Sequence, residues 1–164
     1  MSAPASIFLD DERTLSPSDA AAAILVAPDG RYLLQLRDDK PGIFYPGHWG
    51  CFGGAIEAFD ADVEEGLRRE LAEEIGLPLP KGALKHFSTM SYGLEFAGLG
   101  TVNRAYYEGK IDAGQIGTLR LGEGSRFALH KPREALELRL TPYDAFALWL
   151  HANRARLRPY KGEG

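Results

Sequence analysis

The stretch Trp49–Leu77 reads WGCFGGAIEAFDADVEEGLRRELAEEIGL and decides the fold. Gly53 and Gly54 end an expected strand, a polar loop follows, and a helical pattern then continues to Gly76. A glycine directly after the last periodic residue is a typical helix stop, because glycine adopts the left-handed conformation without steric penalty. The stretch therefore predicts a strand, a loop and a helix in succession.

The predicted helix has one apolar face. Leu67, Leu71 and Ile75 are spaced by four residues, which is the spacing of the buried stripe of an amphipathic helix. We expect this stripe to pack against a sheet.

A second face of the same helix is acidic. At about 100° per residue, Glu73 lies near −60° and Glu74 near +40° from Glu70, so the three carboxylates share one face. Like charges at these spacings repel, and a purely structural helix gains nothing from them. Hard divalent cations such as Mg²⁺ bind carboxylate oxygens, so the pattern predicts a cation site. A solvated acidic face, partly neutralised by Arg68 and Arg69, is the alternative that the spacing leaves open.

Composition and charge narrow the class of protein. The chain has 164 residues, 45% hydrophobic and 26% charged, which is typical of one globular domain. Its net charge is −4, and the acidic residues cluster between Gly53 and Leu77, which argues against a nucleic-acid surface there. Cys51 is the only cysteine, and the longest apolar run, Ala20–Ala27, is far shorter than the ~20 residues of a membrane span. We expect a cytoplasmic protein without membrane or nucleic-acid partners.

The rest of the chain predicts a mixed sheet and a second helix. Strands are expected at Ala20–Ala27 and Arg31–Arg37, joined by a Pro28-Asp29-Gly30 turn, and a shaped loop follows at Asp38–Gly50. Further strands are expected at Leu84–Phe96, Thr101–Ile111, Thr118–Leu121 and Arg126–Leu129, with a short one at Ser6–Leu9.

The second predicted helix is Thr141–Arg156. It begins with Thr-Pro, a favourable helix start, and carries Ala145, Leu148, Trp149 and Ala152 at helical spacing. The expected organisation is a loosely ordered arm over 1–18, one domain over 19–157 and a tail over 158–164.

Residues 69–77, RELAEEIGL, resemble the second half of the Nudix box, G-x5-E-x7-R-E-U-x-E-E-x-G-U, where U is aliphatic. The first half departs from the box, because the sixth residue after Gly54 is Asp60 instead of Glu and one extra residue precedes Arg69. The resemblance covers about Ala20 to Arg156. It implies an α/β fold, namely an α/β/α sandwich around a mixed β-sheet.

The resemblance also implies an activity and a site. Nudix hydrolases use Mg²⁺ or Mn²⁺ to split a phosphoanhydride in a nucleoside diphosphate linked to another moiety. Arg69 would orient Glu70, and Glu70 or Glu74 would act as the base. The implied metal ligands are Glu70, Glu73, Glu74, the carbonyl of Gly53 and, from a distant loop, Glu123.

Four residues are candidates for substrate binding: Arg37, Tyr45, Trp49 and Tyr92. Aromatic rings can stack on a nucleobase, although packing in the core or the sheet explains the same rings. Asp60 and Asp62 precede the helix, and both are expected to cap it.

Two other functions stay open at this point. The inserted residue is compatible with a non-catalytic module that binds a nucleotide or nucleotide sugar. A cysteine near the box also resembles isopentenyl diphosphate isomerase, although Cys51 is expected to be a small buried hydrophobe. The expected partner is a small nucleoside diphosphate derivative, such as a nucleotide sugar, a dinucleoside polyphosphate or a nucleotide, and a homodimer is possible.

Overall fold

The computed structural model describes residues 19–93, 95 and 100–157. The predicted arm with its Ser6–Leu9 strand, the tail over 158–164 and the predicted strand end at Phe96 lie outside the described residues. The strands are β1 (Ala20–Val26), β2 (Tyr32–Leu36), β3 (Trp49–Gly50), β4 (Phe52–Ala55), β5 (Leu84–Gly93), β6 (Thr101–Lys110) and β7 (Arg126–His130). The helices are α1 (Val63–Ile75), α2 (Ala113–Thr118), α3 (Pro132–Glu137) and α4 (Pro142–Asn153).

All the strands belong to one mixed sheet. Its main order is β3-β2-β1-β6-β5, with β4 paired to β1 and β7 paired to β2. The pair β1–β6 is parallel, and the other pairs are antiparallel. The β1–β2 hairpin turns at Pro28–Gly30, where Gly30 has a φ of 83° that glycine accommodates without strain. The predicted hairpin is confirmed.

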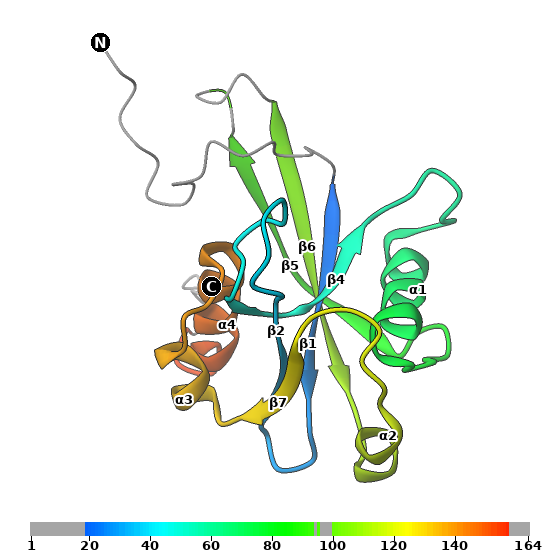
Figure 1. Ribbon diagram of the computed structural model, residues 1–164, viewed down its shortest axis with the longest axis vertical. Helices are drawn as coiled ribbons and strands as arrows, with labels where there is room; N and C mark the ends of the chain where they lie inside the picture. The colour runs from blue at the N-terminus through cyan, green and yellow to red at the C-terminus, as the bar shows by residue number, and fades with distance from the viewer. Residues whose placement is uncertain (1–18, 94, 96–99, 158–164) are drawn as a thin grey trace, which may run out of the picture.

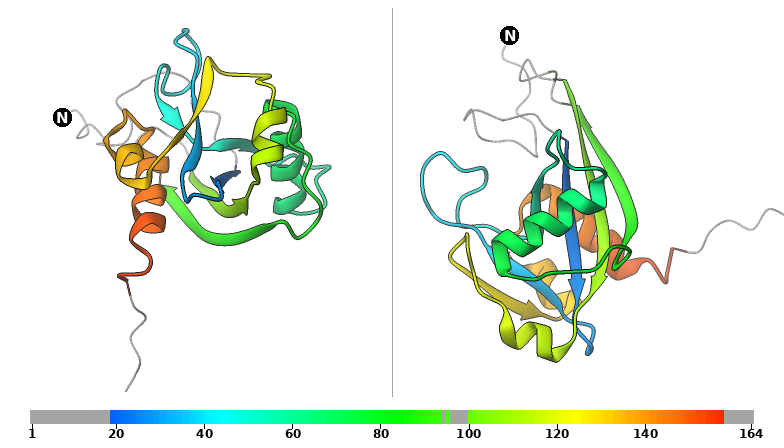
Figure 2. Two further views of the ribbon diagram at one scale, coloured as in Figure 1. Left: turned by 90° about the horizontal axis from the view of Figure 1, so that it is seen from below. Right: turned by 90° about the vertical axis from the view of Figure 1, so that its right-hand side faces the viewer.

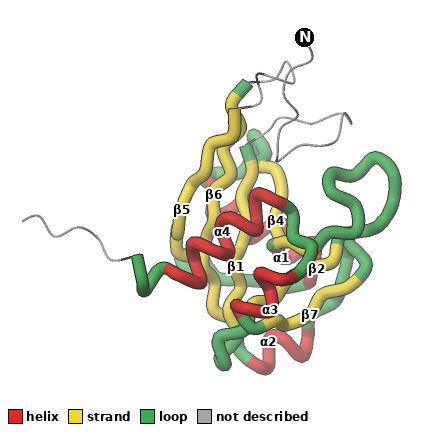
Figure 3. The backbone as a smooth tube through the Cα atoms, turned by 90° about the vertical axis from the view of Figure 1, so that its left-hand side faces the viewer, coloured by secondary structure: helices red, strands yellow, loops and turns green. Residues whose placement is uncertain are grey.

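Helices cover both faces of the sheet. Figure 1 shows α1 on one side of the strands and α3 with α4 on the other. The side views agree, since α1 crosses the front of the sheet in the right-hand view of Figure 2 and α4 crosses its opposite face in Figure 3. The predicted α/β/α sandwich is therefore confirmed. Within the described part of the chain, no helix is long and apolar enough to cross a bilayer.

β1 is the central strand, and successive side chains supply two separate cores. Ala21, Ala23 and Leu25 face the α1 side, while Ala22 and Ile24 face the α4 side. All five are fully buried. A strand buried on both faces reads as a continuous apolar run, as the sequence of Ala20–Ala27 does.

α1 has the ends and the buried stripe that its sequence predicts. Asp62 caps the start, because its side chain accepts a hydrogen bond from the Glu65 N–H, and Gly76 ends the helix with a φ of 63°. Leu67, Leu71 and Ile75 are fully buried against the sheet.

The predicted strand Thr118–Leu121 is wrong. Thr118 is the last residue of α2, and residues 119–121 form a loop. Asp112 and Gln115 form a reciprocal capping box that starts α2, and such local hydrogen bonds favour a helix start over a strand. Trp49 and Gly50, expected in a loop, form the short strand β3, and α3 was not predicted.

The apolar face predicted for the C-terminal helix is also partly wrong. The helix ends at Asn153, before the predicted Arg156, and its Trp149 is 47% exposed. The buried face consists of Asp144, Ala147, Leu148 and His151. Two polar residues therefore occupy core positions that a hydrophobic pattern does not reveal.

Asp144 joins α4 to β6 and to Cys51, the residue between β3 and β4. Its Oδ2 accepts from the Cys51 N–H at 2.9 Å, and its Oδ1 accepts from the Tyr106 hydroxyl at 3.0 Å. The Arg104 guanidinium donates to the same Oδ1 at 3.2 Å and lies over the Tyr143 ring. Asp144 is 1% exposed. Hydrogen bonds from these partners therefore take the place of the hydrogen bonds that an exposed carboxylate makes with water.

His151 lies one helical turn beyond Leu148 and is also buried. Its Nε2 lies 2.7 Å from a Glu108 carboxylate oxygen, and its Nδ1 lies 2.8 Å from the Tyr32 hydroxyl and 2.9 Å from Arg154 Nη1. Burial lowers the pKa of His151, and the neighbouring Glu108 raises it only in part. The ring is therefore neutral in the folded protein at pH 7.

Replacing Asp144 with Ala is expected to lower the free energy of unfolding by about 3 kcal/mol or more, because it leaves Arg104 buried without its counter-ion. Urea unfolding followed by circular dichroism measures the loss. Glu137→Gln, at an exposed position on α3, is the control and should change stability by less than about 0.5 kcal/mol. Equal stability of the two variants would show that the Asp144 contacts contribute nothing net.

Acidification from pH 6.5 to 5 is expected to destabilise the wild type through His151. The unfolded histidine, with an ordinary pKa of 6.5, takes up a proton more readily than the folded one, so stability is full above that pH and falls below it. Urea unfolding across this range should give a shallower pH dependence for His151→Gln. The exposed control His86→Gln should keep the wild-type dependence, and equal slopes in all three proteins would contradict this assignment.

Candidate active site

The site is built where β4 meets α1. Gly53 pairs with Ala22 of β1 and has a φ of 139°, and a β-carbon at Gly53 would collide with the Ala21 carbonyl oxygen. The Gly53 N–H donates to Glu74 Oε2 at 2.9 Å. The last turn of α1 is thereby attached to the strand end, and only glycine fits at the junction.

Glu74 is a carboxylate held largely out of water. It is 8% exposed, and burial raises its pKa to about 7. The Gly53 hydrogen bond and Arg37 lower that pKa, while the nearby charges of Glu70 and Glu123 raise it. The structure thus brings Glu70, Glu74 and Glu123 into one electrostatic group, and a cation among them would favour the ionised form of Glu74.

Glu70 approaches the same strand end. A β-carbon on Gly54 would lie 2.7 Å from Glu70 Oε2, so the second glycine leaves room for this carboxylate. Arg69 Nη1 donates to Glu70 Oε1 at 2.7 Å. The same nitrogen lies 3.4 Å from Glu73 Oε2, and the Glu73 side chain is 62% exposed. Glu73 therefore lies toward the solvent side of the group.

Asp60 does not cap the helix. Its two carboxylate oxygens accept from Arg69 Nε at 3.1 Å and Arg69 Nη2 at 3.0 Å, which is a bidentate ion pair. The Arg69 hydrogen bonds lower the pKa of Asp60, and Asp60 and Glu70 raise that of Arg69. A β-carbon on Gly66 would lie 2.7 Å from Asp60 Oδ2, so this glycine admits the carboxylate against α1. The extra residue in the loop therefore does not prevent the ion pair between Asp60 and Arg69.

Glu123 reaches the site from a loop attached to the end of α1. The Gly122 N–H donates to the Glu74 carbonyl at 2.6 Å, and the Arg120 N–H donates to the Ile75 carbonyl at 3.0 Å. A β-carbon on Gly122 would lie 2.6 Å from the Glu73 carbonyl oxygen, so glycine allows this close approach. These bonds hold the loop of Glu123, which was predicted to supply a distant metal ligand, at the end of α1.

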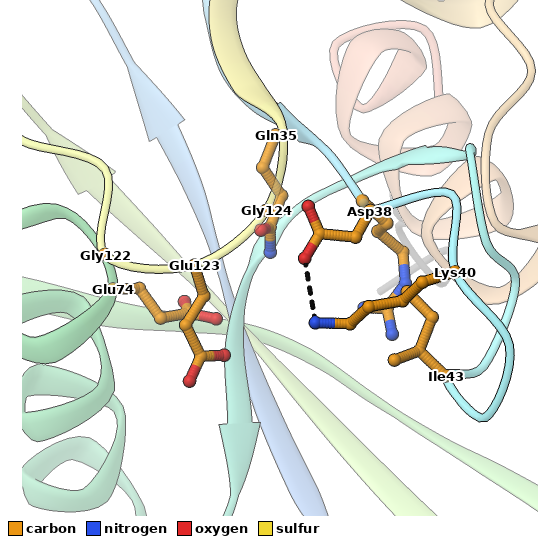
Figure 4. A pocket seen from close by; sticks show the side chains of 9 residues that line it. Gln35, Asp38, Lys40, Ile43, Glu74, Gly122, Glu123 and Gly124 are labelled. Atoms are coloured by element: carbon orange, nitrogen blue, oxygen red, sulfur yellow. Dashed lines mark ion pairs between the residues drawn. The ribbon is translucent and has the colours of Figure 1, made fainter.

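A pocket of about 300 Å³ opens beside these carboxylates. Figure 4 shows Glu74 and Glu123 on the side nearest α1, with Asp38, Lys40 and Ile43 on the opposite loop. It is lined by Gln35, Arg37, Asp38, Lys40, Ile43, Glu74, Gly122, Glu123 and Gly124.

The donor set matches a hard cation that keeps part of its water. Among residues 19–93, 95 and 100–157, no group of three or more His, Cys, Asp or Glu side chains lies close enough together to hold a metal ion. Mg²⁺ ordinarily uses one or two protein carboxylates and completes its shell with water and substrate phosphates. The buried Glu74 beside Glu70 and Glu123 meets that requirement.

The predicted substrate residues separate into two groups. Arg37 lines the pocket, and its Nε donates to the Phe44 carbonyl at 2.7 Å. The ring of Tyr45 contacts the rings of Phe44 and Tyr143, at a backbone φ of 50° that is unusual for a residue with a β-carbon. Tyr45 therefore lies in an aromatic cluster and is not among the residues that line the pocket.

Trp49 and Tyr92 are not brought to the pocket. Trp49 is 7% exposed, within the core on the α4 side, where Arg126 and His130 contact its ring. Tyr92 lies in β5 with its hydroxyl 3.5 Å from the sulfur of Met90. Cys51 is buried in the same core, and burial raises the pKa of its thiol. This matches the expected small buried hydrophobe.

Sequence reasoning missed four side chains that line the pocket, those of Gln35, Asp38, Lys40 and Ile43. The available signal was the run Arg37-Asp38-Asp39-Lys40 directly after an expected strand, because charged residues at a strand end often line sites. It also missed the Asp60–Arg69 pair, which depends on a fold of the loop that no short-range pattern specifies.

Part of the chain is similar in sequence to curated proteins. The chain is 46% identical over 52 residues to the nucleoside triphosphatase NudI of Escherichia coli, and this match covers 32% of the chain and 36% of the relative. The chain thus spans about a third of the length of the curated relatives it matches.

Solved structures share the fold over most of the chain. The MutT protein of Methanosarcina mazei Go1 is 19% identical, with a TM-score of 0.67 over 88% of this chain and 100% of that one. The NUDIX domain of Shewanella oneidensis NrtR, complexed with ADP ribose, is 20% identical, with a TM-score of 0.66 over 88% of this chain and 91% of that one.

A family model also matches the chain. The NUDIX domain model matches residues 16–160, which is nearly the whole chain. The chain therefore belongs to the NUDIX domain family.

Proposed function

We propose that this protein is a metal-dependent pyrophosphohydrolase that cleaves the phosphoanhydride of a nucleoside diphosphate linked to another moiety. The observation that carries the proposal is the buried Glu74 carboxylate, bonded to the Gly53 N–H and surrounded by Glu70 and Glu123. A carboxylate buried at this cost in solvation, with two further acids near it, serves a cation better than it serves the fold. The name of the relative NudI, a nucleoside triphosphatase, supports the same class of reaction.

In this proposal Mg²⁺ or Mn²⁺ is held by Glu70, Glu74, Glu123 and the Gly53 carbonyl, with Glu73 at the solvent side. A bound divalent cation neutralises charge on the diphosphate and lowers the pKa of a water molecule. Glu70 or Glu74 accepts the proton of the water that attacks phosphorus.

Arg69 acts as a positioning residue. Its guanidinium donates to Glu70 while Asp60 holds it on the other side. A charged guanidinium with two carboxylate partners keeps a narrow orientation, and Glu70 is thereby directed toward the strand end. The pocket beside Glu123 then receives the part of the substrate that extends past the anhydride.

Substituting Gln for Glu74 is expected to lower kcat for the best substrate by a hundredfold or more, in the range typical of a positioned acid–base group. The folded state should be no less stable, since burial raises the pKa of Glu74 and removing its charge lessens that cost. Phosphate release from a panel of nucleotides, nucleotide sugars and dinucleoside polyphosphates, with Mg²⁺ or Mn²⁺ and a coupled phosphatase, measures the effect.

Glu57→Gln removes an exposed acid from the same segment and is the matched control. It should retain wild-type turnover, and chelation of the metal should silence both proteins. Wild-type activity in Glu74→Gln would overturn the proposed function. Nucleotide binding without turnover by the wild type would instead support a binding module.

Asp60→Asn is expected to raise the Mg²⁺ concentration for half-maximal activity by about tenfold, as losing a partner of a metal ligand typically does. The neutral amide weakens the ion pair that holds Arg69, which in turn directs Glu70. Metal titrations of steady-state activity measure the shift. Asp62→Asn is the control, because asparagine caps a helix as well as aspartate does, and an equal shift in both variants would contradict a specific role for Asp60.

A further inference from the structure

Phe59 is a large apolar side chain that lies in the loop before α1 instead of in a core. It is 74% exposed, the highest value among the large hydrophobic side chains of the described residues. Arg69 Cζ lies over its ring, 5.3 Å from the ring centroid. Apolar burial therefore contributes little at this position, whereas a cation over an aromatic ring is an attractive contact.

The turn that carries Phe59 is held by hydrogen bonds between the residues around it. The Asp60 N–H donates to the Glu57 carbonyl at 3.1 Å, and the Glu57 N–H donates to Asp60 Oδ2 at 2.9 Å. The same Asp60 oxygen accepts from Arg69 Nη2 at 3.0 Å. One carboxylate therefore fixes both the turn and the guanidinium, and it sets where the Phe59 ring lies relative to Arg69.

Arg69 has two acidic partners that compete for one of its nitrogens. Nη1 lies 2.7 Å from Glu70 Oε1 and 3.4 Å from Glu73 Oε2, and the Glu73 side chain is 62% exposed. A guanidinium that moved toward Glu73 would weaken its bond to Glu70. Because attraction to a ring requires the cation to stay over it, Phe59 favours the position in which Glu70 is the nearer partner.

We propose that Phe59 is a positioning residue that keeps the Arg69 guanidinium directed at Glu70 and thereby strengthens divalent-cation binding. This inference rests on the proposed function, in which Glu70 is a metal ligand. Partners that orient a metal ligand typically raise the affinity of the site, because the ligand loses less freedom when the cation binds. The ring acts through Arg69 and takes no part in proton transfer.

The first test measures Mn²⁺ binding without substrate, by electron paramagnetic resonance of the free ion. Phe59→Leu keeps an apolar side chain but removes the ring, and it should weaken Mn²⁺ binding by about threefold, as losing an exposed cation–π contact does. Phe59→Trp supplies the ring type that attracts a cation best, so it should bind Mn²⁺ as the wild type does. Phe146→Leu is the matched control, because Phe146 is a second exposed phenylalanine, on α4, and it should leave the affinity unchanged.

The second test asks whether the ring acts through Arg69. In an Arg69→Gln background the cation is absent, so adding Phe59→Leu should cause no further loss of Mn²⁺ affinity, which is the result expected of a coupled pair. Three results would each overturn the role of Phe59: equal affinities in Phe59→Leu and Phe146→Leu, an equal loss in Phe59→Trp, or a full threefold loss in the Arg69→Gln background.

Turnover separates this role from the proposed function. Phe59→Leu should raise the Mg²⁺ concentration for half-maximal activity by about threefold, while kcat at saturating Mg²⁺ stays within about twofold of the wild type. Wild-type metal dependence in this variant would refute the role of Phe59 and leave the hydrolase. Absence of all turnover, with Mn²⁺ binding that still depends on Phe59, would refute the hydrolase and keep the positioning role.

Discussion

The hydrogen bond from the Gly53 N–H to the Glu74 carboxylate is the contact on which the site depends. It joins the last turn of a helix to the end of a strand, and it places a negative charge where water is scarce. Glycine is required on the strand side, since a β-carbon there would collide with the Ala21 carbonyl. The other features of the site, namely the Arg69 ion pairs, the Glu123 loop and the charged pocket, are arranged around this contact.

Buried polar and charged side chains have different kinds of partners on the two faces of the sheet. On the α4 side, Asp144 and His151 are each surrounded by partners from the strands, and their charges and hydrogen bonds are satisfied internally. On the α1 side, Glu74 has one backbone donor, and the charge of Arg37 is opposed by those of Glu70 and Glu123, so its pKa stays raised. The first arrangement holds the layers together. The second leaves a buried carboxylate whose charge a cation would compensate.

Most of the fold was predictable because local signals agreed with it. The continuous apolar run of β1, the Pro-Asp-Gly turn and the α1 stripe of Leu67, Leu71 and Ile75 were each visible as a local pattern in the sequence. The wrong predictions concern residues whose positions depend on contacts between distant segments of the chain. The polar core residues of α4 need partners on distant strands, and Trp49 is drawn into the core. The α1 carboxylates were predictable because helix geometry fixes their spacing, whereas Lys40 and Asp60 lie on loops whose paths depend on tertiary contacts.

The Gly122–Glu74 backbone bond has a consequence for motion. Glu74 contributes its side chain to the site and its carbonyl to the loop that carries Glu123, and the neighbouring Arg120–Ile75 bond acts on the same turn. The loop therefore cannot swing outward without breaking both bonds, which would leave the last carbonyls of α1 without these partners. Amide exchange at Gly122 then reports how often this loop opens.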